Sequence, residues 1–265
     1  MLASCAPKEA RWTEEKARQW YDAQRWLVGC DYIPSDAINQ IEMWSGDTYN
    51  HDLIDKELSW AEDLGFNTLR VYLSSVVYEN DAQGLKARMD DFLGICDSHS
   101  IRPLFVFFDD CWNAESWYGV QPEPKPGIHN SGWVRDPSDA LRADTVALYP
   151  KLETYMKDVL VTFAKDKRIL MWDLYNEPGN SRYKSASLPL LKKAFEWAQS
   201  VRPSQPLTSG VWSNPLKELN EFQLANSDVT SYHCYSGPEA QQHAIDTLST
   251  YGRPLVCTEY MARTK

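Results

Sequence analysis

Short apolar and β-branched runs alternate along this chain with longer segments whose apolar residues recur every three or four positions. The runs predict seven buried strands, and the segments between them predict amphipathic helices. Residues 51–64 are typical, since Ile54, Leu58 and Ala61 share one helical face and Gly65 follows as a stop signal. The predicted strands are Trp26–Cys30, Asn67–Leu73, Arg102–Phe108, Leu170–Tyr175, Pro206–Val211, Val229–Tyr235 and Pro254–Thr258.

This alternation predicts a parallel sheet with right-handed crossovers in an α/β fold. Two architectures fit, an open doubly wound sheet and a (β/α)8 TIM barrel. The open sheet usually has a glycine-rich turn after its first strand, but the sequence there is Gly29-Cys30-Asp31-Tyr32, so the barrel is favoured. The predicted helices are 8–24, 51–64, 85–99, 148–165, 188–201, 239–251 and a shorter one at 215–224.

No repeat, low-complexity tract or charge block divides the chain, so residues 8–265 are predicted to form a single (β/α)8-type domain. A barrel needs eight strands, and only five residues follow Tyr260. We therefore expect the eighth βα unit to be missing at the C-terminus, which would leave the edges of the first and seventh strands unpaired.

Composition narrows the classes of ligand. A formal net charge of −10 argues against nucleic acid, whose phosphates require a basic surface. Eleven Trp and fourteen Tyr are typical of a protein that stacks aromatic rings on its ligands. The six cysteines show no metal-ligand spacing, and no metal or organic cofactor is expected. We expect a monomer.

Residues 1–7 are interpreted as a signal remnant or linker. Leu2-Ala3-Ser4-Cys5 resembles the lipobox of bacterial lipoproteins, in which the cysteine is lipidated after signal cleavage. On this interpretation Met1 lies inside a longer signal peptide, and a lipid on Cys5 attaches the protein to a membrane. The expected location is then the bacterial envelope or outside the cell. The alternative is a chance tetrapeptide.

Polar residues gather where the predicted strands end. The carboxyl ends of barrel strands share one mouth, where barrel enzymes build their active sites. Two of these strands deliver a glutamate, Glu177 and Glu259, and a facing pair of carboxyl groups is what cleavage of a glycosidic bond requires. The other strand ends supply Asp31, Arg70, Tyr72, Asp109, Asp110, Asn176, Trp212, His233 and Tyr235.

The segment Trp172-Asp173-Leu174-Tyr175-Asn176-Glu177-Pro178 resembles the fourth-strand signature of the retaining glycoside hydrolase clan with (β/α)8 barrels. Within that clan it is most similar to glycoside hydrolase family 5, the cellulase and mannanase family. A later apolar strand ending Thr258-Glu259-Tyr260 strengthens the resemblance, which extends from the first predicted strand to the seventh. It implies that Glu177 is the acid/base and Glu259 the nucleophile. A charged Glu259 would also raise the pKa of a neighbouring carboxyl, so we expect Glu177 to hold its proton.

The resemblance implies supporting roles for four further residues. Asn176 would hydrogen-bond the sugar 2-hydroxyl, Arg70 would keep the nucleophile ionised, and Tyr235 would donate to it. His233 would contact the substrate or the acid/base. Two departures stand out: the third strand ends in Asp109-Asp110-Cys111-Trp112, where family 5 commonly has a histidine, and the eighth-strand tryptophan is absent with its strand.

The connection 111–147 is longer than an ordinary connection between a strand and a helix, and such a length is typical of a binding loop. It is rich in aromatic residues and stiffened by prolines. We expect it to form part of a glycan cleft in which Trp112, Trp133 and Trp212 stack on sugar rings. For each of these rings, plain packing is the alternative.

Together these features predict a retaining O-glycosyl hydrolase, of the endo-β-1,4-glycanase type, whose partner is an oligo- or polysaccharide such as glucan, mannan or xylan. One alternative is an exo-acting β-mannosidase-like enzyme of the same clan. Another is a non-catalytic glycan-binding surface lipoprotein. A serine or cysteine hydrolase is disfavoured because the chain has no nucleophile-elbow motif.

Overall fold

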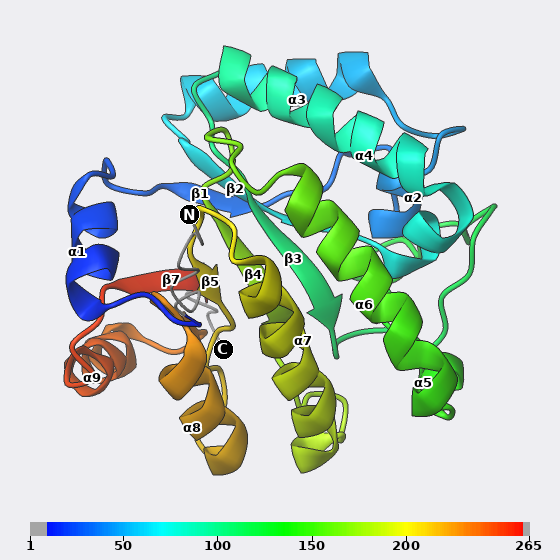
Figure 1. Cartoon of the computed structure of the whole chain (residues 1–265). Helices are drawn as coiled ribbons and strands as arrows, with labels where there is room; N and C mark the ends of the chain where they lie inside the picture. Colours follow the sequence, from blue (N-terminus) through cyan, green and yellow to red (C-terminus); the bar gives the residue numbers. More distant parts are fainter. Residues whose placement is uncertain (1–9, 262–265) are drawn as a thin grey trace, which may run out of the picture.

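The computed structural model describes residues 10–261, which form parallel strands with helices packed against them (Figure 1). The interpretation of residues 1–7, including a lipid on Cys5, lies outside the described residues. Five strands pair in chain order, two further strands pair with each other, and a parallel bridge between Val211 and Tyr232 joins the two groups. The strands are β1 (Gly29–Asp31), β2 (Thr68–Tyr72), β3 (Leu104–Asp109), β4 (Met171–Asn176), β5 (Leu207–Thr208), β6 (Thr230–Cys234) and β7 (Leu255–Tyr260).

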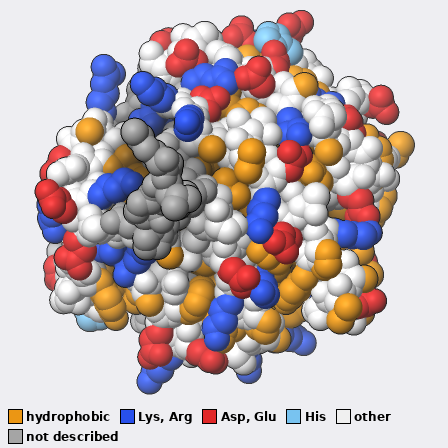
Figure 2. Space-filling model, viewed as in Figure 1, with side chains coloured by type: hydrophobic (Ala, Val, Ile, Leu, Met, Phe, Trp, Pro, Cys, Tyr) orange, Lys and Arg blue, Asp and Glu red, His pale blue; other side chains and the backbone are white. Residues whose placement is uncertain are grey.

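Helices connect the successive strands, and α3, α4, α6 and α7 cover one face of the sheet (Figure 1). On the same side of the molecule, Figure 2 shows Lys and Arg side chains interspersed with Asp and Glu. Within residues 10–261, no helix is long and apolar enough to cross a bilayer. The helices are α1 (Glu14–Asp22), α2 (Gln40–Trp44), α3 (His51–Asp63), α4 (Ser75–Ser98), α5 (Asp139–Arg142), α6 (Thr145–Thr162), the 3₁₀ helix η1 (Lys184–Ser187), α7 (Leu188–Val201), α8 (Lys217–Asn226) and α9 (Pro238–Ser249).

The predicted α/β class is confirmed, and each predicted strand is present, although β1 and β5 are shorter than expected. The prediction for α4 was wrong at its start, because the helix begins at Ser75, where the Ser74 side chain caps it. Asp81 interrupts α4 with non-helical backbone angles, which hides the helical period in the sequence. The helices α2 and α5 were missed because five or four residues are too few to show a period.

The main core lies between the sheet and its covering helices. Every residue of β3 and β4 is buried. Phe105 and Phe107 point to the helix side and pack their rings on Trp172, with centroids 5.6 and 5.4 Å away. Because successive strand residues face opposite sides, Leu104 and Val106 point the other way, into a smaller apolar cluster that Trp20 of α1 packs against.

The sheet order begins at β1 and finishes at β7. Among the described residues neither outer edge has a strand partner. All three residues of β1 are exposed, including Cys30.

Candidate active site

Glu177 directly follows β4 and has a φ of +43°, in the left-handed region. In a continuous strand, neighbouring side chains would face opposite sides. Here both Asn176 and Glu177 contact the Cys111 thiol, with Asn176 Nδ2 at 3.6 Å and Glu177 Oε2 at 3.2 Å from Sγ. The left-handed turn therefore brings two consecutive side chains to the same side. A non-glycine residue in this conformation costs about 1–2 kcal/mol.

Glu259 lies on β7, next to β6. Tyr232 is in register with Cys257, but the next pair is His233 with Glu259, so Thr258 is an extra residue in β7. Bulges of this kind commonly redirect a side chain beside an active site. The bulge sets Glu259 directly opposite His233.

His233 bridges the two glutamates. Its Nδ1 lies 2.9 Å from Glu177 Oε1 and 3.7 Å from Glu259 Oε2. One carboxylate oxygen of each glutamate lies within 4.8 Å of the other. A retaining glycosidase uses a similar spacing, with its two carboxyl groups about 5–5.5 Å apart.

The same three side chains offer donor atoms close enough to ligate one metal ion. Carboxylate and imidazole ligands would suit Zn²⁺ or a similar divalent ion. However, both glutamates already accept hydrogen bonds from protein donors. Asn180 donates to Glu177 Oε2, and Tyr235 donates to Glu259 Oε2, the oxygen nearer His233. These hydrogen bonds fit two carboxyl groups that exchange protons with a substrate, and a metal ion is not needed to explain their arrangement.

Arg70 of β2 is the cation of the site and is buried. Its Nη1 lies 2.5 Å from Glu259 Oε1, and its Nη2 donates to Asp173 at 2.7 Å and to Asn176 at 2.8 Å. Tyr235 donates to the other Glu259 oxygen at 2.6 Å. Burial alone would raise the pKa of Glu259, but Arg70, His233 and Tyr235 outweigh it and lower that pKa. Glu259 is therefore held as a carboxylate.

Asn176 is oriented through both ends of its amide. Its oxygen accepts from Arg70, and its nitrogen donates to Asp109 Oδ1 at 2.9 Å. Asp109 is buried at the end of β3, and that burial raises its pKa to about 8, against hydrogen bonds from Asn176 and Cys111 that lower it. The third-strand aspartate thus stands behind Asn176 and sets its orientation.

Asp110 is 0% exposed. It accepts hydrogen bonds from Tyr175 Oη at 2.6 Å and from Gly179 N at 2.7 Å, bonds Ser187 Oγ, and forms a 2.7 Å ion pair with Arg142. These contacts fix the turn after β4 that carries Glu177. The structure therefore gives Asp110 a supporting role, in which it positions this turn.

Asp31 ends β1 and forms a weaker 3.3 Å ion pair with Arg70. Trp212 is half-buried, and its indole donates to Pro178 O at 3.1 Å, beneath the Glu177 turn. Trp133 packs edge-on against Trp112, with ring centroids 5.5 Å apart, and lies 6.1 Å from the Tyr72 ring.

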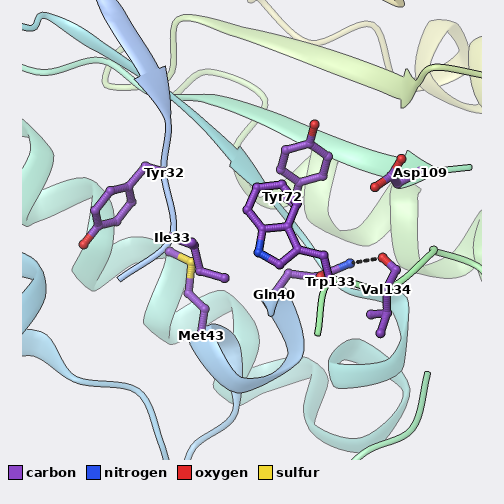
Figure 3. Close-up of a pocket in the computed structure, with 8 residues that line it drawn as sticks. All are labelled: Tyr32, Ile33, Gln40, Met43, Tyr72, Asp109, Trp133 and Val134. Atoms are coloured by element: carbon purple, nitrogen blue, oxygen red, sulfur yellow. Dashed lines mark hydrogen bonds between the residues drawn. The ribbon is translucent and has the colours of Figure 1, made fainter. Parts of the chain in front are cut away.

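A small hollow opens beside this aromatic group (Figure 3). Figure 3 shows the Trp133 and Tyr72 rings side by side, with the Asp109 carboxyl beyond them. Tyr72 Oη is 3.3 Å from Glu259 Oε1, so the hollow adjoins the candidate nucleophile. It is lined by Tyr32, Ile33, Gln40, Met43, Tyr72, Asp109, Trp133 and Val134.

Two residues that contact Glu177 were not predicted, Cys111 and Asn180. Cys111 could have been found from the sheet order. Asp109 of β3 pairs with Asn176 of β4, so Cys111 and Glu177, which follow this pair on the two strands, are expected to lie close together. Asn180 follows Glu177 by three residues in an irregular turn, for which spacing gives no signal.

Neither a protein-family model nor a curated protein matches the sequence. Solved structures do match. An exo-β-1,4-mannosidase from Opitutaceae bacterium strain TAV5 is 18% identical with a TM-score of 0.62, over 88% of this chain and 45% of that one. An endo-1,4-β-D-mannanase from Thermotoga petrophila RKU-1 is 16% identical with a TM-score of 0.56, over 89% and 79%. A GH5_18 protein from Streptomyces cattleya is 12% identical with a TM-score of 0.54, over 79% and 51%.

This chain has the fold of those enzymes. The resemblance to the family 5 barrel is therefore confirmed at the level of architecture, including the predicted order of parallel strands. The chain spans less than half the length of the exo-mannosidase and about half that of the GH5_18 protein.

Proposed function

We propose that this protein is a retaining glycoside hydrolase that cleaves β-linked glycans by double displacement. The observation that carries the proposal is the pair of carboxyl groups, Glu177 and Glu259, with oxygens within 4.8 Å of each other and His233 between them. The two glutamates come from non-adjacent strands and converge at the carboxyl-terminal edge of the sheet. Nucleophilic attack and proton donation on one acetal require such convergence.

Glu259 is the nucleophile in this mechanism. Its lowered pKa keeps it ionised, and it attacks the anomeric carbon to form a covalent glycosyl ester. Arg70 and Tyr235 hold both of its oxygens by hydrogen bonds, which fixes the direction of attack. As the bond to the leaving oxygen breaks, Glu177 transfers its proton to that oxygen.

Glu177 then acts as the base. It takes a proton from water, and the resulting hydroxide attacks the anomeric carbon and releases the Glu259 carboxylate. Two inversions at the same carbon give net retention. Asn176, held between Arg70 and Asp109, is placed beside the sugar 2-hydroxyl.

We propose β-1,4-linked mannan or manno-oligosaccharides as the substrate, with endo-cleavage as the first mode to test. The structural neighbours with TM-scores above 0.5 include an exo-β-1,4-mannosidase and an endo-1,4-β-D-mannanase. The Trp112–Trp133 pair beside the hollow offers ring faces for such a chain.

The lipobox-like residues 2–5 support the further proposal that the mature protein is a bacterial envelope lipoprotein that meets its polysaccharide as a monomer. Globomycin-sensitive processing and radiolabelled palmitate incorporation at Cys5 would test the lipid, and Cys5→Ser is the matched control. Light scattering of the purified chain would test the monomer.

The proposal is tested by incubating the purified chain with mannohexaose and following the anomeric protons by NMR. We expect β-configured products to appear first and to mutarotate afterwards. Glu259→Gln and Glu177→Gln should each lower turnover at least a hundredfold, while Glu196→Gln, an exposed surface carboxylate, should not. Binding of mannohexaose without product release in the unaltered chain would instead support the glycan-binding alternative, and α-configured first products would rule out retention.

A further inference from the structure

The two oxygens of Glu177 have different partners. Oε1 faces His233 Nδ1 at 2.9 Å, on the side turned toward Glu259. Oε2 accepts from Asn180 Nδ2 at 2.6 Å and from the Cys111 thiol at 3.2 Å. The carboxyl group therefore has one oxygen toward the cleft and one oxygen held by two donors behind it.

Cys111 is held in place by its neighbours. It follows β3, its backbone N–H donates to Asp109 Oδ1 at 2.9 Å, and its side chain is buried. Its sulfur also accepts from Asn180 Nδ2 at 3.1 Å. Burial, together with the nearby charges of Asp109 and Glu177, raises the pKa of the thiol well above its usual value. The group therefore keeps its hydrogen, and it can donate to Glu177.

We propose that Cys111 is a positioning residue for the acid/base: its thiol, together with Asn180, occupies Glu177 Oε2 and leaves the transferable proton on Oε1. This inference rests on the proposed function, because it assigns the proton that the first step of the mechanism needs. The physical reason is that a neutral carboxyl group has one good acceptor, its carbonyl oxygen. Two donors aimed at Oε2 make that oxygen the carbonyl, so the hydroxyl is at Oε1, where the glycosidic oxygen would bind.

A hydrogen bond donated to a carboxylate favours its ionised form, so removing the thiol should make Glu177 harder to ionise. The other titratable groups that face Glu177 or lie close to it are His233, Glu259, Tyr235 and Asp109. None of these groups is itself replaced by a substitution at position 111. Asp109 loses a hydrogen bond from the Cys111 side chain in Cys111→Ala, and Cys111→Ser, which retains a donor, controls for that loss.

The test compares Cys111→Ala and Cys111→Ser with the unaltered chain. Protein labelled with ¹³C at glutamate carboxyl carbons is titrated by NMR, and the Glu177 signal is assigned by its loss in Glu177→Gln. In Cys111→Ala we expect the titration midpoint to rise by about 0.5–1 pH unit, the effect of one lost hydrogen bond. Cys111→Ser retains a donor and should return the midpoint to within about 0.3 unit of the original.

Activity gives the second readout. Cys111→Ala should lower kcat on mannohexaose about three- to tenfold with little change in KM, and shift the basic limb of the pH–rate profile upward with the NMR midpoint. Cys30→Ser, at the exposed edge of β1, is the control and should change neither. An unchanged midpoint in a folded Cys111→Ala protein would overturn the proposal. If the unaltered chain cleaves no glycan, the proposed function fails, but the NMR titration still decides whether the thiol acts on Glu177.

Discussion

Arg70 Nη1 lies 2.5 Å from Glu259 Oε1, although 189 positions separate the two residues in the chain. Through its other nitrogen, the same guanidinium reaches Asp173 and Asn176 of β4. One planar cation thus ties β2 to β4 on one side and to β7 on the other. The relative position of the two candidate catalytic strands depends on this side chain.

Replacing Arg70 by Lys should separate charge from geometry. Lysine retains the positive charge but cannot hold Glu259, Asp173 and Asn176 at once. Because each lost charge-assisted hydrogen bond is worth about 1.5–3 kcal/mol, we expect kcat to fall roughly 10- to 100-fold. Arg70 lowers the pKa of Glu259, so the acidic limb of the pH–rate profile should move to higher pH. Arg18→Lys on the exposed face of α1 is the control. An unmoved acidic limb would contradict this account of Glu259.

Stability should fall as pH rises from mildly acidic to mildly basic. Burial raises the pKa of Asp109 to about 8 and that of Asp136 to about 7, from an ordinary value of 3.8. Between pH 4 and 8 the folded chain therefore binds more protons than the unfolded chain, and the free energy of unfolding decreases with pH. Calorimetry should give a higher Tm at pH 5 than at pH 8. Asp109→Asn, which mimics the neutral form, should reduce that difference, and an unchanged difference would count against the raised pKa.

Asp110→Ala should destabilise the protein strongly. The substitution leaves Arg142 as a largely buried cation without its ion-pair partner and frees the Gly179 N–H, so we expect a loss of about 3 kcal/mol in the free energy of unfolding. Urea denaturation measures the loss. Asp139→Asn breaks a more exposed ion pair with Arg135 and should change stability by no more than about 1 kcal/mol. Similar costs for the two substitutions would show that Asp110 does not anchor the turn.

Trp133→Ala should weaken glycan binding. Its ring lies between Trp112 and Tyr72 and lines the hollow beside Glu259. Loss of an aromatic contact at such a site typically costs about 1–3 kcal/mol, so KM for manno-oligosaccharides should rise roughly tenfold or more. Trp60→Ala, an exposed ring on α3, is the control. Equal KM values for the two variants would place the sugar elsewhere.

The strand order and the two glutamates could be predicted from the sequence because both follow from local patterns. Buried parallel strands form continuous apolar runs, and Glu177 and Glu259 stand at the ends of two such runs. The position of Glu259 relative to His233 could not be predicted, because it depends on one extra residue, Thr258, that no apolar period reveals.

The role of Asp110 shows a second limit. A carboxylate at a strand end can bind a ligand or support the site, and the sequence does not distinguish the two. Asp110 is buried among Tyr175, Gly179, Ser187 and Arg142. Asp109, its neighbour, lines the hollow instead. Which of two adjacent residues faces the cleft depends on the twist and register of β3, and those are set by packing against β4.

The left-handed backbone at Glu177 has a consequence for the evolution of the chain. Glycine or asparagine would occupy that position with less strain, but neither carries a carboxyl group. The strained backbone at residue 177 thus lowers local stability, but it keeps a carboxyl group where the proposed proton transfer needs one. Selection for heat resistance alone would therefore favour glycine or asparagine at position 177. Such a variant would be more stable, but it would lack the proposed acid/base carboxyl group.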